Sequence, residues 1–420
     1  MSVSDFPVDV LRRHFPALRS TGSCVFFDNA AGAQVPDGVI EAVQHHLTER
    51  NVQRGGRYPR SMAVDAMISR ARSHVAALVN ARRPEEIAFG MNATSFIRTV
   101  SLAIGQMLDE RDEIIVTDLD HEANIATWLA LEHIGAKVRW WHMREDGRLH
   151  AADLHRLLGR RARLVACTLT SNAVGTIVDV RAAADVAHAA GAEIFIDAVH
   201  YGPHGIIDVQ AFDCDYLVCS GYKIFAPHMG FLWGRHEALL RLPTFREDFI
   251  PDEPPGKLEA GTFTYENVAG MAAAIDYLAE AGRAVPGRGG APGKTSLRDD
   301  CRVAMAAIRQ YEKGLSRELL RVLRGCGAEI HGLGEQEQVA ERVPTFCFNL
   351  PGISPAAVTQ AAAAAGIAIR DGHMYSPRLM RRLGLSVESG AVRASLAHYN
   401  TVEEIGRLGA VLARLVEART

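Results

Sequence analysis

Short apolar runs alternate along the first half of the chain with longer segments in which apolar residues recur every three to four positions. The runs Ile194–Ile196 and Tyr216–Cys219 are apolar throughout and end in the polar groups Asp197 and Ser220-Gly-Tyr-Lys223. Fully apolar strands are typical of a parallel sheet that is covered on both faces. Segment 64–80 is typical of a helix, because its apolar residues follow a helical period, at positions 64, 67, 68, 71, 75 and 78.

The alternation of strand and helix extends on the N-terminal side of these runs. The pattern predicts strands within 25–28, 86–90, 113–117, 138–142 and 164–170, and helices at 39–50 and 181–190. Repeated strand–helix units of this length indicate a doubly wound α/β domain with right-handed crossovers. We therefore expect a large domain built on a mostly parallel sheet.

The pattern changes after Gly234. Residues 243–258 are rich in proline and acidic groups and predict a loop, which a helix at 266–281 follows. Residues 282–294 hold five glycines and two prolines and predict a mobile connection. A long helix at 297–324 then leads into a C-terminal α+β part.

The chain divides into four expected parts. At 420 residues it is too long for one ordinary core and fits two domains. An amphipathic N-terminal segment, 1–24, is expected to pack with the small domain. The large domain spans 25–281, the mobile loop 282–296, and the connecting helix with the smaller C-terminal domain 297–420.

Composition narrows the classes of function. With 48% hydrophobic and 23% charged residues and a net charge of -3, nothing favours binding to nucleic acid or to an anionic membrane. No signal segment or membrane span is evident, so we expect a cytoplasmic protein. The seven cysteines are scattered without a C-x-x-C pair, and His45-His46 is typical of an exposed helical pair, so we expect neither a disulfide framework nor a metal site.

The candidate catalytic residues follow the carboxyl ends of the predicted strands. Ligands of open α/β sheets bind beyond the carboxyl ends of the strands, and two neighbouring strands deliver Asp197 and Lys223 there. A lysine can form a Schiff base, and a carboxylate can keep a pyridinium nitrogen protonated. This pair is what pyridoxal 5′-phosphate (PLP) needs.

Two further segments contain groups that can bind an anion. Asn92-Ala-Thr-Ser95 would supply hydroxyls and free N–H groups at a helix N-terminus, a natural phosphate site, although Ser and Thr also cap ordinary helices. Arg54 and Arg57, beside two glycines, are either anion contacts or solvated loop residues.

These landmarks, in this order, resemble the class V aminotransferase group of fold-type I PLP enzymes, especially the cysteine desulfurase-like branch. The resemblance runs from Asp28-Asn-Ala-Ala to Arg393-Ala-Ser-Leu-Ala-His-Tyr-Asn, and Lys223 lies 26 positions (223 − 197) after Asp197. It implies the fold-type I architecture, with a large doubly wound sheet domain and a smaller C-terminal α+β domain.

The resemblance also implies roles for individual residues. Lys223, Asp197 and His121 are the expected catalytic residues, with His121 stacked on the cofactor ring. Thr262 is expected to reach the phosphate site of the other subunit of a homodimer. The expected cofactor-binding residues are Ala93, Thr94, His121, Asn172, Asp197, His200, Ser220, Tyr222, Lys223 and Thr262, and the expected substrate-binding residues are Asn172, Arg370, Arg393, His373 and Tyr375.

Three positions depart from the desulfurase pattern. His200 stands where desulfurases carry glutamine, near the phenolate oxygen of the cofactor, and Tyr222 stands where they carry histidine. The loop Arg370-Asp-Gly-His-Met-Tyr-Ser-Pro377 has no cysteine, although desulfurases place their nucleophilic cysteine there. Tyr375, in the vacated place, is either a proton donor or part of the pocket lining. The pattern indicates a subfamily without the persulfide cysteine.

The expected reaction is chemistry at Cα and Cβ of an amino acid, through a Schiff base and a quinonoid. The favoured outcome is β-elimination of the C–S lyase type, with His373 or Tyr375 giving a proton to the leaving group. Transamination and epimerisation are alternatives. An alternative of another class is a non-catalytic PLP-binding partner of a sulfur-transfer system. The side chain of the substrate is not encoded in any readable motif.

Overall fold

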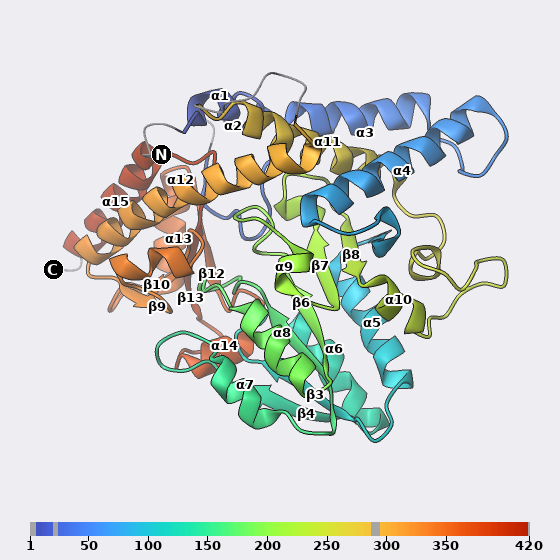
Figure 1. Ribbon diagram of the computed structural model, residues 1–420. Helices are drawn as coiled ribbons and strands as arrows, with labels where there is room; N and C mark the ends of the chain where they lie inside the picture. The colour runs from blue at the N-terminus through green and yellow to red at the C-terminus, as the bar shows by residue number, and fades with distance from the viewer. Residues whose placement is uncertain (1–5, 20–23, 287–294, 419–420) are drawn as a thin grey trace.

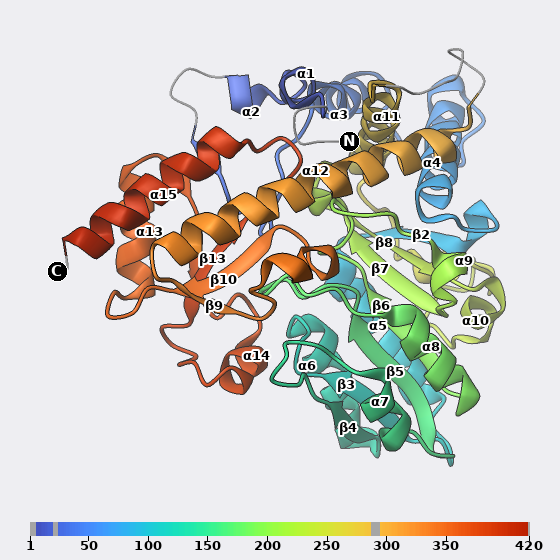
Figure 2. The same ribbon diagram turned by 60° about the vertical axis from the view of Figure 1, so that its left-hand side comes forward.

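The computed structural model describes residues 6–19, 24–286 and 295–418. It has a large sheet with helices on both faces and a smaller sheet formed by the C-terminal residues, and the long helix α12 (Leu297–Gly325) runs along both (Figures 1 and 2). The predicted fold class is confirmed.

The large sheet has seven strands, of which only β8 runs against the others. The parallel strands place their carboxyl ends along one edge, as the pattern predicted. The spatial order is β2 (Ile87–Gly90), β8 (Gly230–Gly234), β7 (Tyr216–Ser220), β6 (Glu193–Asp197), β5 (Ala162–Thr168), β3 (Glu113–Thr117) and β4 (Lys137–Trp141).

Successive residues of each central strand enter two different cores. In β6, Ile194 and Ile196 join one core and Phe195 joins the other, and both faces of the strand are fully buried. This explains the continuous apolar runs, since a sheet covered on both faces leaves no solvent side. One face carries α5 (Ala93–Gln106), α6 (Ala123–Leu129) and α10 (His236–Arg241); the other carries α4 (Pro59–Val79), α7 (Ala151–Leu157), α8 (Val180–Ala189), α9 (Val209–Phe212) and α11 (Tyr265–Arg283).

Helices α3 (Asp37–Glu49), α4, α11 and α12 pack together on that second face (Figure 1). The predicted helix 64–80 begins earlier, at Pro59, because proline suits the first turn of a helix. It ends at Asn80, whose φ of 61° is left-handed. The predicted helix 266–281 continues to Arg283, and α12 begins after the Ser296 cap.

The C-terminal part is an antiparallel sheet packed on helices. Its strands lie in the order β12 (Arg370–Gly372), β13 (Ala391–Ser395), β10 (Thr345–Asn349) and β9 (Glu329–His331). Its helices are α13 (Pro355–Ala364), α14 (Pro377–Arg382) and α15 (Val402–Glu417). The short strand β1 (Val25–Phe26) pairs in parallel with β11 (Ile367–Ala368), so residues near the start of the chain are hydrogen-bonded to this part.

The two predicted loops differ in how much of each the structure describes. Residues 243–258 are mostly irregular, as predicted, with one turn of 3₁₀ helix at Gly256–Leu258. For the loop 282–296, the predicted mobility falls mainly on residues 287–294, which lie outside the described residues. The division into domains remains a prediction.

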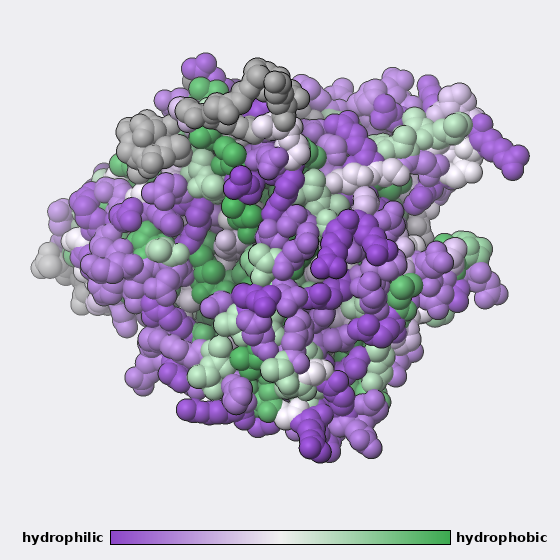
Figure 3. Space-filling view, in the orientation of Figure 1, coloured by the Kyte–Doolittle hydropathy of each residue, from purple (hydrophilic) through white to green (hydrophobic). Residues whose placement is uncertain are grey.

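The face shown in Figure 3 is mainly hydrophilic, with hydrophobic residues gathered in small patches. In the described part of the chain, the large apolar side chains with the highest exposure are Phe245, 93% exposed, and Phe249, 81% exposed. Within the described ranges, no helix is long and apolar enough to cross a membrane.

The N-terminal segment is fixed by an aromatic cluster between both parts of the molecule. Phe15, between α1 (Val8–Arg12) and α2 (Pro16–Arg19), is fully buried. Its ring lies 5.3 Å from that of Tyr277 on α11 and 4.9 Å from that of Tyr399 near the C-terminus. The segment therefore contacts α11 of the large-sheet part as well as the C-terminal part.

Phe15→Ala should lower the free energy of unfolding by about 3–5 kcal/mol, the usual cost of removing a buried aromatic ring. Urea denaturation measures this change. The matched control is Val10→Ala in the same segment: Val10 is 51% exposed, and its loss should cost no more than about 0.5 kcal/mol. Equal effects of the two substitutions would contradict the assigned role of Phe15.

Candidate active site

Two neighbouring parallel strands place Asp197 and Lys223 in one buried cleft. Asp197 ends β6, and Lys223 lies in the 3₁₀ turn Gly221–Lys223 that follows β7. The side chains are buried, with relative exposures of 7% for Asp197 and 5% for Lys223. The Val199 N–H donates to Asp197 Oδ1 at 2.9 Å, which fixes the orientation of the carboxylate.

Burial shifts the protonation of both groups. Desolvation has the largest effect on the pKa of Lys223, and the positive charge of Arg393 lowers this pKa further. The pKa of Lys223 therefore falls to about 8, although the negative charge of Asp197 opposes the change. Burial raises the pKa of Asp197, against the hydrogen bond from Val199 and the charge of Lys223. A lysine with a lowered pKa is partly neutral near physiological pH and can act as a nucleophile or base.

His121 lies on the turn after β3 and lines the same cleft. The Ala123 N–H donates to His121 Nδ1 at 3.0 Å, so the ring carries its proton on Nε2. Burial, together with the positive charges of Lys223 and Arg393, lowers the pKa of His121 to about 4. The ring is therefore neutral, as suits a residue that covers an aromatic cofactor.

A buried carboxyl group holds this turn in place. Asp120 is bonded by the hydroxyl of Thr117 and by Asn124 Nδ2, the latter at 2.7 Å, and Trp128 Nε1 donates to Asn124 Oδ1 at 3.0 Å. Burial raises the pKa of Asp120 to about 7. Sequence reasoning missed Asp120.

The start of α5 lies at one end of the cleft. Asn92 caps this helix through the Ser95 N–H at 2.8 Å, and the Ala93 N–H points to Ser220 Oγ at 3.3 Å. Thr94 also lines the cleft. Gly230 permits this packing, because a Cβ there would lie 2.5 Å from the Asn92 carbonyl carbon.

Tyr222 and His200 line the inner part of the cleft. The Tyr222 ring is stacked on His228 at 5.3 Å, and Lys223 Nζ lies 5.9 Å from its centroid. His200 Nε2 lies 2.9 Å from Thr345 Oγ1, whereas His200 Nδ1 is buried without a partner among the described residues. A polar atom of this kind favours a ligand in the cleft.

The two arginines that we expected to bind the substrate, Arg370 and Arg393, both bind the carboxylate of Asp28, to which sequence reasoning assigned no role. Arg393 Nη1 donates to the Asn172 carbonyl at 2.9 Å and its Nη2 to Asp28 Oδ1 at 3.0 Å. Arg370 binds the same carboxylate, with Nε at 3.0 Å and Nη2 at 2.8 Å from Asp28 Oδ2. The two arginines are thus brought together, as predicted for one pocket, with Asp28 between them.

The loop after β12 presents Tyr375 at the mouth of the cleft. Met374 and Tyr375 both have left-handed backbones, with φ of 52° and 58°. Asn172 Nδ2 donates to the Met374 carbonyl at 2.7 Å, and the Glu122 N–H donates to the Tyr375 carbonyl at 2.8 Å. The Tyr375 ring lies 5.7 Å from that of His121.

His373 takes a different position from Tyr375. His373 Nδ1 accepts from the Tyr375 N–H at 3.1 Å, and the side chain is not among the described residues that line the cleft. All seven cysteines lie in the described part of the chain, and none lines the cleft.

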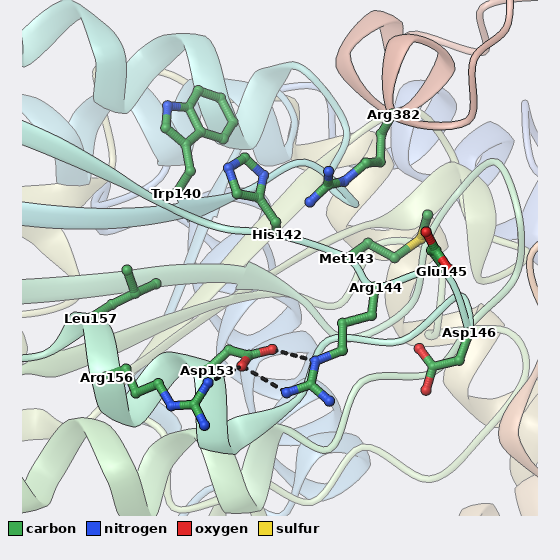
Figure 4. Close-up of a pocket in the computed structure, with 10 residues that line it drawn as sticks. All are labelled: Trp140, His142, Met143, Arg144, Glu145, Asp146, Asp153, Arg156, Leu157 and Arg382. Atoms are coloured by element: carbon green, nitrogen blue, oxygen red, sulfur yellow. Dashed lines mark hydrogen bonds and ion pairs between the residues drawn. The ribbon is translucent and has the colours of Figure 1, made fainter.

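Helix α14 docks this loop on the large domain. Arg378 Nε lies 3.2 Å from Glu122, and Arg382 Nε lies 2.9 Å from the buried Asp118 on the turn that carries His121. A second hollow of about 720 Å³ opens beside this contact. Figure 4 shows Arg144 and Asp153 paired within it and Arg382 reaching in from α14.

Thr262 lies apart from the cleft. Its hydroxyl accepts from Gln53 Nε2 at 2.5 Å, and the residue is exposed. Arg54 is paired with Asp65 at 3.1 Å, which favours the interpretation of Arg54 as a loop residue over its interpretation as an anion contact. In the described part of the chain, no three His, Cys, Asp or Glu side chains are grouped to hold a metal ion.

The lining as a whole fits PLP. An inner cavity, with Asp197 and His200, joins an outer one of about 910 Å³, with Arg370, Arg393 and Tyr375. The cleft offers an amine, a buried carboxylate, a neutral ring and an anion-binding helix end. The residues shared by both cavities are Thr94, His121, Asn172, Ser220, Tyr222 and Lys223.

The chain is similar to known proteins over nearly its whole length. The aminotransferase-like protein FGM3 of Gibberella zeae is 35% identical, over 97% of this chain and 98% of its own. A cysteine desulfurase of Synechococcus elongatus is 33% identical, over 98% of this chain and 64% of its own. The apo structure of a cysteine desulfurase from Thermococcus onnurineus NA1 has a TM-score of 0.86 at 25% identity, covering 98% of both chains.

A second solved structure, the cysteine desulfurase CsdA of Escherichia coli, has a TM-score of 0.81 at 27% identity, covering 98% of this chain and 99% of its own. The model of the family described as Aminotransferase class-V matches residues 25–285 and 301–408. The chain therefore belongs to the class V aminotransferase family of PLP-dependent enzymes.

Proposed function

We propose that this enzyme catalyses β-elimination from an amino acid, with cleavage of a C–S bond as the favoured reaction. PLP, when bound through Lys223, supplies an electron-withdrawing ring that makes the Cα proton of an amino acid acidic. Asp197 would hold the ring nitrogen, His121 would cover the ring, and the phosphate would bind at Ala93, Thr94, Ser220 and Tyr222. His200 would face the phenolate oxygen.

The observation that carries the proposal is the nature of the groups around the reacting carbon. Lys223, with its pKa lowered to about 8, can take the Cα proton near neutral pH. Arg393, with Asn172 at its side, would hold the α-carboxylate and orient the Cα–H bond toward Lys223. No thiol among the described residues lines the cleft to attack a substrate sulfur, which supports elimination over persulfide formation.

Tyr375 is the better placed of the two proton donors considered for the leaving group. Its side chain lines the outer cavity, whereas His373 is engaged with the loop backbone. A phenol can protonate a departing thiolate and return to its neutral form from solvent, because Tyr375 is 55% exposed.

We also propose that the active unit is a cytoplasmic homodimer in which Thr262 contacts the phosphate site of the other subunit. Thr262 is exposed and lies apart from the cleft of its own chain. The exposed Phe245 and Phe249 lie in the preceding segment, and large exposed apolar side chains favour a covered surface.

Lys223 should take up PLP with a pH dependence set by its lowered pKa. Because only the neutral amine reacts, the rate of uptake by the apoprotein should fall as the pH drops through about 8, rather than through 10.5. Arg393→Gln should raise this midpoint, since the charge of Arg393 contributes to the lowered value. The absorbance band of bound PLP reports the rate, and Lys223→Ala should show no such band. A midpoint near 10.5 would contradict the assignment.

Mixing the holoenzyme with L-amino acids that carry a β-leaving group should release pyruvate and ammonia in equal amounts. Product analysis decides between the reactions: conversion of the cofactor to its amine form with release of a 2-oxo acid means transamination, and loss of optical purity alone means epimerisation. No spectral change with any amino acid would favour a non-catalytic PLP-binding partner.

Tyr375→Phe should slow elimination from S-alkyl cysteines by roughly 10²-fold, the contribution of a general acid. The same variant should act on β-chloro-L-alanine as fast as the wild type, because chloride leaves without a proton. The elimination rates of His373→Asn, measured on the same two substrates, show which of the two residues is the proton donor. Equal rates of Tyr375→Phe and wild type on both substrates would remove Tyr375 from the mechanism.

A further inference from the structure

Asp28 occupies a position that the proposed reaction leaves unexplained. Arg370 on β12 and Arg393 on β13 are direct cross-strand partners, an arrangement that is unfavourable for two like charges. Asp28 lies between them and bonds both guanidinium groups, at 2.8 Å from Arg370 Nη2 and 3.0 Å from Arg393 Nη2. The side chain of Arg393 is only 2% exposed, so its charge is weakly screened by solvent.

We propose that Asp28 is a specificity-determining and positioning residue that sets the charge of the carboxylate-binding subsite. This inference rests on the proposed function, in which Arg393 binds the substrate α-carboxylate. Two guanidinium groups and one carboxylate leave a net charge of one positive unit. The subsite is therefore matched to a single carboxylate, and the substrate class is amino acids without a second carboxylate at this end of the cleft.

The described lining of the outer cavity contributes no second carboxylate that could offset the two arginines. Among the described residues that line the outer cavity, the charged ones are Arg98, Lys223, Arg370 and Arg393, and none is an acid. Asp28 is thus the carboxylate that offsets the two arginines. It leaves Nη1 of Arg370 without a described partner, whereas Nη1 of Arg393 is held by the Asn172 carbonyl.

Backbone contacts fix Asp28 where both arginines can reach it. Asp28 forms a parallel bridge with Ser395, and the neighbouring Asn29 donates through Nδ2 to the Ser395 carbonyl at 2.9 Å and to the Phe26 carbonyl at 2.8 Å. Asp28 therefore lies in a preorganised position, and its carboxylate competes with any anion for Arg370.

Asp28→Asn keeps the shape of the side chain and removes its charge. Arg370 then lacks a charged partner and is available for a second carboxylate. A charge-assisted hydrogen bond gained in this way should shift the ratio of the dissociation constants of L-alanine and L-aspartate by at least about tenfold in favour of L-aspartate. Titration of the holoenzyme, followed by the absorbance of PLP, measures both constants.

Two variants control this measurement. Glu404→Gln makes the same change of carboxylate to amide on α15, in the ion pair with Arg12 at 3.0 Å, and should leave the ratio unchanged. The double variant Asp28→Asn with Arg370→Gln should lose the gain, because the freed guanidinium is absent. An unchanged ratio in folded Asp28→Asn, or a gain that persists in the double variant, would overturn the inference.

Two further measurements keep the test decisive. If thermal melting shows that Asp28→Asn does not fold, Arg370→Gln alone decides: the subsite then has no net charge, and L-alanine should bind at least about tenfold more weakly. Unchanged binding would overturn the inference. Calorimetry of acetate and malonate binding to the apoprotein repeats the comparison of one carboxylate with two, without an amino acid. If the wild-type holoenzyme responds to no amino acid, that result counts against the proposed function but leaves the inference about Asp28 to be decided by calorimetry. A malonate preference that Asp28→Asn fails to increase counts against Asp28.

Discussion

The active site depends on keeping an amine and a carboxylate buried together at the edge of a parallel sheet. Desolvation disfavours the charged form of each group, and their mutual attraction offsets only part of that cost. The two-sided cover of the large sheet is what excludes water from Lys223 and Asp197. A sheet open on one face would leave the lysine near its ordinary pKa and protonated, without a nucleophile.

The remaining parts of the site are held by contacts that cross between the two sheets. Asn172 joins the large sheet to the loop of Met374 and to Arg393, and His200 meets Thr345 of the small sheet. The loop of Tyr375 contains two residues with left-handed backbones. These contacts and the docking of α14 offset the cost of that conformation. The distance between Lys223 on the large sheet and the arginines on the small sheet is therefore set by the packing of the two parts.

The sequence predicted those site residues that end a buried strand or begin a helix. Asp197, Lys223, His121 and Thr94 follow apolar runs whose burial is readable, and their role followed from the family pattern. Asp28 was not assigned a role, because a two-residue strand gives no sign of which arginines, 342 and 365 positions away, it will bind. Thr262 cannot be placed in a site from one chain, since its expected partner belongs to another subunit.

The pairing of β1 with β11 has a consequence for the order of events during synthesis. Asp28 is made 365 positions before Arg393, the arginine that it binds. The contact between Asp28 and Arg393 can therefore form only after the 365 intervening positions have been made, whereas the strands carrying Asp197 and Lys223 can pair much earlier. A nascent chain would then be able to hold the cofactor before it could recognise an amino acid.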